Sequence, residues 1–205
     1  MDENRLQRAV DQSEILELVK NWAYARDNGD WEVLASCYQP DATMHISWIS
    51  DTAAAFIEGS KKMLAKTTSH EPGKHNIGST RIRINGNRAA GEVHAELLRR
   101  LRRNGVDFDT QTWGRFLDLY EKRDDGVWRI FKRTMVYEKD RLDPVDPSQL
   151  PQGFWENIDL DRFPPECRFL CYRLSLIGQD VRDNIIPVHS DAEKAVLAEQ
   201  DAWIA

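Results

Sequence analysis

Three charged or titratable side chains occupy positions where the surrounding pattern favours apolar residues. Asp27 flanks the apolar stripe of a predicted helix, and His75 begins a predicted strand directly after the segment HEPGK. Arg133 shares one face of a predicted strand with apolar residues, although the opposite face is partly apolar too. A buried charge needs a partner, and an ion pair of Asp27 with Arg133 would supply one. Structural roles are the simpler interpretation of all three residues, and acid–base chemistry is the alternative.

The familiar catalytic motifs are absent from the sequence. It contains no Walker loop, no G-x-G-x-x-G, no G-x-S-x-G and no H-E-x-x-H. The histidines lack the spacing of metal ligands, and a metal pair of His70 with His75, which flank Gly73, is a disfavoured alternative. What remains is acid–base chemistry without a metal or cofactor, or no chemistry at all.

The bulk composition is that of an ordinary globular protein with a core of its own. Of the 205 residues, 41% are hydrophobic and 30% are charged, which suits one domain with an elaboration or two small ones. The formal net charge of −6 argues against nucleic-acid binding, and we interpret the basic run LRRLRRNG (98–105) as a solvated strand or loop edge. No apolar run approaches the ~18 residues of a membrane span, and the polar N-terminus does not resemble a signal peptide. We therefore expect a soluble, cytoplasmic protein with no membrane or nucleic-acid partner.

Helical patterns come first along the chain. The apolar spacing in DQSEILELVKNWAYARD predicts a helix over 4–27, with Ser13 as its expected N-cap and Gly29 in the C-cap position. Three further elements are predicted before the pattern changes: a short helix at 31–38, a strand at 41–48 and a helix around 58–68.

Four long strands then follow, joined by turns. The first ends in the alternation of HNIGSTRIRI, and NGN (85–87) is a strong hairpin signal. The segment 88–103 could form a helix, but the turns on both sides of it favour a strand. The remaining two strands are predicted at 110–123 and 127–140. Helices followed by a run of strands predict an α+β fold, with helices packed on one curved, mixed or antiparallel sheet.

The last part of the chain has a different composition. Residues 141–166 are rich in proline and predict an extended arm that wraps the surface. Helices are expected at 167–178 and 190–205. We therefore divide the chain into a domain at 1–140 and an arm with C-terminal helices at 141–205 that packs on it.

Taken together, the stretches of residues 8–140 resemble a known fold. The segments that carry the resemblance are ILELVKNWAYARDNGDWEVLASCYQPDATMHI, KHNIGSTRIRINGNRAAGEV and LDLYEKRDDGVWRIFKR. They are similar to the nuclear transport factor 2-like cone, and within it to the SnoaL-like group that includes scytalone dehydratase and γ-hexachlorocyclohexane dehydrochlorinase. The resemblance implies a strongly curved sheet and three helices that enclose a conical, mostly apolar cavity.

The resemblance also implies a catalytic pair. Members with dehydratase or dehydrochlorinase activity use a histidine that takes a proton from carbon and an aspartate that orients it. Matched by motif, Asp27 in AYARD corresponds to the aspartate and His75 in KHNIG to the histidine. Arg133 in VWRIFKR matches a cavity arginine of the dehydrochlorinase, which implies stabilisation of a developing negative charge or leaving group.

One position departs from the dehydrochlorinase pattern. That enzyme has a lysine five residues before its aspartate, whereas this chain has Trp22. The missing leaving-group partner argues against haloalkane elimination, and a tryptophan favours a flat aromatic or polycyclic substrate. We expect Trp22 and Trp113 to contact the substrate, and Tyr24 either adds a hydroxyl to the cavity or faces solvent.

Two functions of different classes follow from these expectations. The first is a cofactor-independent, dehydratase-like lyase or an isomerase that acts on a small hydrophobic, cyclic molecule, with His75 as general base, Asp27 as its orienter and Arg133 as electrostatic partner. Within that class, a steroid-isomerase-like reaction would use Asp27 itself as the base. The second is a non-catalytic module that binds a small molecule or assembles with its own kind. A homo-oligomer is expected in either case, because such cones commonly pair through the outer face of the sheet.

Overall fold

One curved sheet organises the chain. The computed structural model describes residues 2–66, 71–156, 158–179 and 181–205, without the side chain of Arg182. Strand order in the sheet is β2-β1-β6-β5-β4-β3, and β7 pairs with β6 outside this order. The strands are β1 (Tyr38–Ile46), β2 (Ile49–Thr52), β3 (Gly73–Asn85), β4 (Arg88–Arg103), β5 (Val106–Lys122), β6 (Trp128–Pro144) and β7 (Ile186–Pro187). Since β1 and β7 run parallel to β6 and the other described pairs are antiparallel, the predicted α+β class with a mixed sheet is confirmed.

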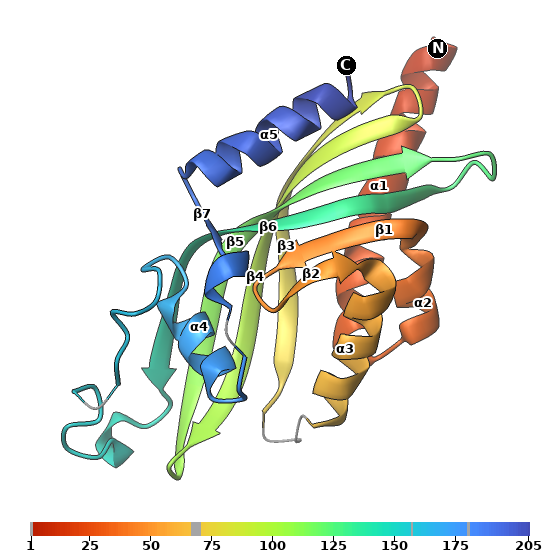
Figure 1. Cartoon of the computed structure of the whole chain (residues 1–205). Helices are drawn as coiled ribbons and strands as arrows, with labels where there is room; N and C mark the ends of the chain where they lie inside the picture. The colour runs from red at the N-terminus through yellow and green to blue at the C-terminus, as the bar shows by residue number, and fades with distance from the viewer. Residues whose placement is uncertain (1, 67–70, 157, 180) are drawn as a thin grey trace.

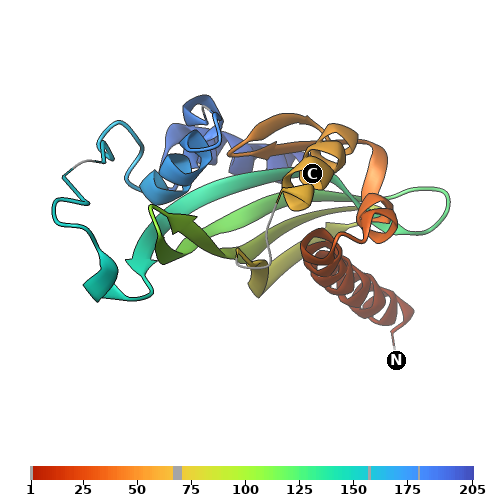
Figure 2. The same ribbon diagram turned by 90° about the horizontal axis from the view of Figure 1, so that it is seen from below.

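Helices lie at both sides of this sheet. They are α1 (Glu3–Asn28), α2 (Trp31–Ser36), α3 (Ala53–Ala65), α4 (Arg168–Ser175) and α5 (Asp191–Trp203), with 3-10 turns η1 (Pro147–Gln149) and η2 (Arg182–Asn184). Figure 1 shows α1, α2 and α3 together at one side, and α4 beside the long segment that follows β6 at the other. Figure 2 shows the curvature of the sheet and the first turns of α1 projecting beyond it. The N-terminal helices and α4 therefore approach the sheet from opposite ends.

α1 has nearly the range predicted for it, but its N-cap is not the expected one. Its N-cap is Asp2, whose side chain accepts the Asn4 N–H, so the expectation of a cap at Ser13 is wrong and Ser13 lies inside the helix. Gly29 ends the helix, as expected, because glycine adopts the left-handed conformation (φ +73) that the cap requires. Asp27 therefore lies in the last turn of α1.

The other predicted helices are present with shifted ends. α3 begins at Ala53 rather than near residue 58, because the Thr52 hydroxyl accepts the Ala55 N–H and caps the helix there. α4 is shorter than the helix expected at 167–178, and α5 starts after Ser190, which caps it.

β4 is a strand over its full predicted length. Residues 88–103 pair with β3 on one side and with β5 on the other. Gly86, in the turn before β4, has the positive φ of +56 that a tight hairpin needs. The choice of strand over helix for this segment is confirmed.

A bulge in β6 changes which side chains face the interior. The pairing of β5 with β6 shifts register between Leu119 and Tyr120, and Phe131 has no pairing partner there. Ile130 before the bulge and Arg133 after it are both buried, whereas Phe131 stacks on a helix outside the sheet. Strict alternation therefore fails in this part of β6, because Phe131 is the extra residue of the bulge: Phe131 and Lys132 both face α5, and Arg133 faces the interior.

α5 covers part of the outer face of the sheet. The ring of Trp203 stacks on that of Phe131, with centroids 4.8 Å apart. Leu197 packs against the small cluster of Leu117 and Val136. The face through which such cones commonly pair is covered here by a helix of the same chain, and the expected homo-oligomer stays a prediction.

The C-terminal segment shares its core with the rest of the molecule. β6 runs on to Pro144, past the boundary predicted at residue 140. Leu170 and Cys171 of α4 belong to the same buried cluster as Trp22 of α1. The division into a domain at 1–140 and a segment at 141–205 that packs on it stays a prediction.

Candidate functional site

Asp27 of α1 and His75 of β3 are hydrogen-bonded to each other. Nδ1 of the His75 ring lies 2.5 Å from Oδ1 of Asp27, and the His75 backbone N–H donates to Oδ2 over 2.7 Å. A carboxylate can only accept in this arrangement, so the neutral ring carries its proton on Nδ1 and keeps a lone pair on Nε2. The Asp27 and His75 side chains are 15% and 18% exposed. The structure thus brings together the two residues that the resemblance matched to an orienter and a base.

The ends of two elements fix this contact. Asp27 is held in the last turn of α1 by the Gly29 cap, and α1 packs along β3, where His75 is one of the first residues. His75 pairs with Leu97 of β4, so the backbone carrying the ring is part of the sheet. Both partners therefore sit on regular elements, which favours a precise geometry.

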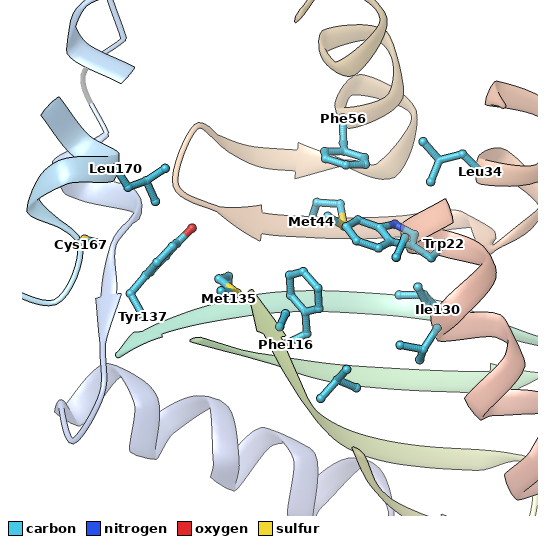
Figure 3. Close-up of a cluster of buried hydrophobic side chains, with 14 of the residues drawn as sticks. Trp22, Leu34, Met44, Phe56, Phe116, Ile130, Met135, Tyr137, Cys167 and Leu170 are labelled. Carbon is cyan, nitrogen blue, oxygen red and sulfur yellow. The ribbon is translucent and has the colours of Figure 1, made fainter. Parts of the chain in front are cut away.

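Trp22 forms an aromatic wall beside His75. Its ring meets the His75 ring edge-on at 5.4 Å and the Phe116 ring at 5.2 Å, and it stacks on Phe56 at 6.2 Å. Its indole N–H donates to the Tyr38 hydroxyl over 2.5 Å, so the one polar atom of the side chain is satisfied. Figure 3 shows Trp22 between Phe56 and Phe116.

His75 and Trp22 line a cavity of about 90 Å³. Most of its wall is apolar and comes from α1, β1, α3, α4 and the inner face of the sheet. Figure 3 shows Met135 and Tyr137 farther along the sheet, with Leu170 of α4 beyond them. The Tyr137 hydroxyl accepts the Ser47 backbone N–H over 2.7 Å, which leaves its own proton to be donated to another group.

Arg133 lies behind this wall and is paired with a different carboxylate from the one expected. Its side chain is 0% exposed and makes two hydrogen bonds to Asp118, at 2.8 and 2.6 Å. Its guanidinium stacks on Trp22 at 4.2 Å and on Phe116 at 4.1 Å. The expected Asp27–Arg133 pair is therefore wrong, because Asp118 on the neighbouring β5 lies directly opposite Arg133 in the sheet. Arg133 is outside the lining of the cavity, so we assign it no contact with a substrate.

Two aromatic residues expected at the substrate lie elsewhere. Tyr24 is 77% exposed, because it lies on the solvent side of α1. Trp113 lies beneath the cationic groups of Lys139 and Arg141, at 4.7 and 5.8 Å, whereas its neighbour Thr112 lines the cavity. Alternation along β5 turns Trp113 to the other face of the sheet. Tyr24 thus follows the second of its two expectations and faces solvent, and neither residue is among the described residues that line the cavity.

Three arginines among the described residues line the cavity, and the sequence pattern indicated no role there for any of them. Arg26 is 9% exposed and sits 5.9 Å from the centre of the Phe56 ring. Arg99 belongs to the basic run that we interpreted as solvated, and Arg173 comes from α4. Burial lowers the pKa of all three, and the charge of Arg99 lowers the pKa of Arg26 and Arg173 further. Of the three arginines, Arg26 alone has a signal in the sequence, because its position in the predicted helix places it by the apolar stripe.

No metal-binding cluster is present in the described ranges. Groups of three or more His, Cys, Asp or Glu side chains in metal-binding proximity are absent there, and His70, the suggested partner of His75 in a metal pair, lies outside those ranges. None of the described helices has the length and apolar composition of a membrane span.

Comparison with known proteins identifies the family. The model of the SnoaL-like domain matches residues 7–134. The chain belongs to the SnoaL-like family. A relative in this comparison is Pea pathogenicity protein 2 of Fusarium vanettenii, which is 31% identical over 165 residues, covering 80% of this chain and 69% of the relative.

Solved structures confirm the fold and the resemblance. LinA, a hexachlorocyclohexane dehydrochlorinase, matches with a TM-score of 0.58 at 21% identity, over 72% of this chain and 97% of LinA. A proposed scytalone dehydratase from Novosphingobium aromaticivorans matches with a TM-score of 0.56 at 16% identity, over 74% of this chain and 100% of that one. The SnoaL-like domain of this chain therefore has the cone fold of a group that includes lyases.

Proposed function

We propose that this protein is a cofactor-independent lyase or isomerase that removes a proton from carbon in a small hydrophobic, cyclic molecule bearing a hydroxyl or carbonyl group. The observation that carries the proposal is the Asp27–His75 contact at the wall of an apolar cavity. Nε2 of His75 takes the proton, and the Asp27 carboxylate holds the ring in the required tautomer and stabilises the imidazolium that forms.

The same contact favours His75 over Asp27 as the base. Both oxygens of Asp27 accept hydrogen bonds from His75, one from the ring and one from the backbone. A carboxylate engaged in this way is a poor acceptor for a substrate proton, whereas Nε2 has no hydrogen-bond partner among the described residues. The steroid-isomerase-like variant with Asp27 as base therefore has less support.

Tyr137 is the residue we assign to the developing negative charge in place of Arg133. Removing a proton next to a carbonyl places charge on the carbonyl oxygen, and a hydrogen-bond donor there lowers the barrier. Tyr137 lines the cavity and has a proton to donate, since its oxygen already accepts the Ser47 N–H. Dehydrochlorination remains disfavoured because Trp22 occupies the position of the lysine.

Turnover tests this proposal. Wild-type protein is incubated with a panel of cyclic hydroxyketones and hydroxylated tetralones, and loss of water or isomerisation is followed by mass spectrometry and absorbance. We expect His75→Gln to lower the rate by about 10²–10⁴-fold, the usual contribution of a general base. Tyr24→Phe, on the exposed side of the same helix turn, is the control and should retain full activity. Equal turnover of His75→Gln and wild type on any substrate would refute the assignment, and binding without turnover across the panel would support the non-catalytic alternative.

A further inference from the structure

The cavity wall contains cationic groups that proton abstraction by His75 does not use. Arg26 is nine-tenths buried and lines the cavity, and among the described residues it has no hydrogen bond or ion pair. Arg173 lines the same cavity from α4 and likewise lacks such a partner within the described ranges. A guanidinium without a carboxylate partner is costly to bury, which makes the two side chains a site for an anion.

The carboxylates around the cavity offset this charge only in part: burial is the largest effect on the pKa of Arg26 and Arg173, and it outweighs the opposite effects of Asp27 on Arg26 and of Glu71 on Arg173. Asp27 accepts two hydrogen bonds from His75, and Glu96, the acidic residue in the lining, accepts the Asn76 side-chain amide. Burial lowers the pKa of Arg26 and Arg173, which means that the folded protein disfavours their charged forms. An anionic ligand between them would relieve that cost.

The cavity shares part of its wall with a second hollow that is strongly basic. This hollow has a volume of about 730 Å³, and Trp48, Met63, Arg99 and Arg173 line both spaces. Among the described residues, its lining holds seven lysine and arginine side chains and one carboxylate, that of Glu71.

Part of that charge is compensated by ion pairs and part is not. Arg100 pairs with Asp109 and Arg102 pairs with Asp107. Lys62, by contrast, is exposed and has no ion pair in the described part of the chain. A concentration of positive charge at the mouth of a cavity, on a chain with a net charge of −6, attracts anions selectively to that mouth.

We propose that the cavity, together with the adjoining part of the hollow, takes a cyclic, apolar molecule that carries a carboxylate, with Arg26 and Arg173 binding the carboxylate and the ring lying against Trp22 and His75. The inference deepens the proposed function, because it assigns a charge to the molecule presented to His75. Planar guanidinium groups match carboxylates well, and charge-assisted hydrogen bonds of this kind are strong when they are buried.

The test is equilibrium binding of two probes of the same shape. 1-Naphthoate and 1-naphthamide are titrated by calorimetry at pH 7 into wild type, Arg26→Gln, Arg173→Gln and Arg129→Gln. Arg129 pairs with Asp125 in the turn between β5 and β6 and serves as the matched control. We expect naphthoate to bind at least 10-fold more tightly than naphthamide to wild type and to Arg129→Gln. Arg26→Gln and Arg173→Gln should each remove most of that preference without weakening naphthamide.

Equal affinity of the wild type for the two probes, or no binding of naphthoate at millimolar concentration, would overturn the proposal. Should Arg26→Gln fail to fold, Arg173→Gln alone decides, because Arg173 is on a different helix and is more exposed. His75→Gln is titrated in parallel. Because it alters the wall against which the ring lies, it should weaken the binding of both probes alike and keep the preference for naphthoate over naphthamide. Absence of a carboxylate preference in the wild type would thus refute the anion site, whereas unchanged turnover in His75→Gln would refute His75 as the base.

Discussion

At the residue scale, the site depends on the partners of three charged side chains, which are those of Asp27, Arg133 and Arg26. Asp27 is hydrogen-bonded to His75, and Arg133 forms an ion pair with Asp118. The ion pair of Asp27 with Arg133 that the sequence pattern suggested therefore does not form. The Arg26 side chain has no hydrogen bond or ion pair with another described residue. The chemistry of the cavity therefore rests on the side chains that line it, and Arg133 acts on them only through the rings of Trp22 and Phe116.

The buried Arg133–Asp118 pair leads to a testable prediction about the free energy of unfolding. Arg133→Met should lower the free energy of unfolding by about 3–5 kcal/mol, because it leaves Asp118 buried without its counter-charge. The double variant Arg133→Met/Asp118→Leu should lose much less, since both charges are then removed. Urea denaturation of the two variants measures the difference. A single variant as stable as the wild type would mean that the pair is not buried as described.

Asp140 links pH to the position of α4. Burial raises the pKa of Asp140 to about 6, although it accepts the Leu170 backbone N–H at the start of α4. The folded protein therefore binds this proton more tightly than the unfolded chain, and stability falls as pH rises from about 4 through about 6. The raised pKa thus costs folding free energy at neutral pH and nothing below pH 4.

Replacing Asp140 with Asn should remove that cost while keeping an oxygen for the Leu170 N–H. We expect Asp140→Asn to raise the stability at pH 7.5 by roughly 1 kcal/mol, after allowance for solvent screening. This corresponds to a rise in Tm of about 2–4 °C, and no rise should appear at pH 4. Thermal unfolding at both values of pH measures it. An equal change in Tm at the two values would contradict the pH linkage.

At the element scale, α5 covers part of the outer face of the sheet, the face through which we expected two chains to pair. It packs Leu197 on Leu117 and Val136, and Glu193 contributes to a charge cluster with Arg115. The outer face of the sheet is apolar at these positions because α5 packs on it. This explains why both faces of β6 contain apolar residues.

Leu197→Asp should therefore weaken the docking of α5. Placing a carboxylate against the outer face of the sheet should lower the free energy of unfolding by roughly 1–2 kcal/mol and expose apolar surface. Light scattering should then show a larger mass for this variant than for the wild type. Ala198→Asp, at an exposed position of the same helix, is the control. Identical mass and stability of Leu197→Asp and the wild type would indicate that α5 does not hold the sheet.

At the scale of the whole molecule, local patterns predicted most of the elements, and the family motifs predicted the central pair. Asp27 and His75 could be matched because each lies near the end of an element, in a short motif that carries the resemblance to the family. The errors come from features that are not local. Tyr24 and Trp113 face the wrong way for substrate binding, because the rotation of α1 and the face of β5 depend on tertiary packing.

The remaining parts of the site arise from segments distant in the sequence. Arg173 reaches the cavity from α4, outside the residues that match the family domain. The partner of Arg133 is set by the register of β5 against β6, which a one-residue bulge decides. Sequence pattern alone does not contain either of these relations.

The central claim is that Nε2 of His75 takes a proton from carbon, and deuterium exchange tests it without requiring a leaving group. Cyclic ketones of the panel are incubated with the protein in D2O, and incorporation of deuterium next to the carbonyl is followed by mass spectrometry. The account predicts exchange above background with wild type, background exchange with His75→Gln and an intermediate rate with Asp27→Asn, which keeps the ring but weakens its orientation. Exchange by His75→Gln at the wild-type rate would contradict it.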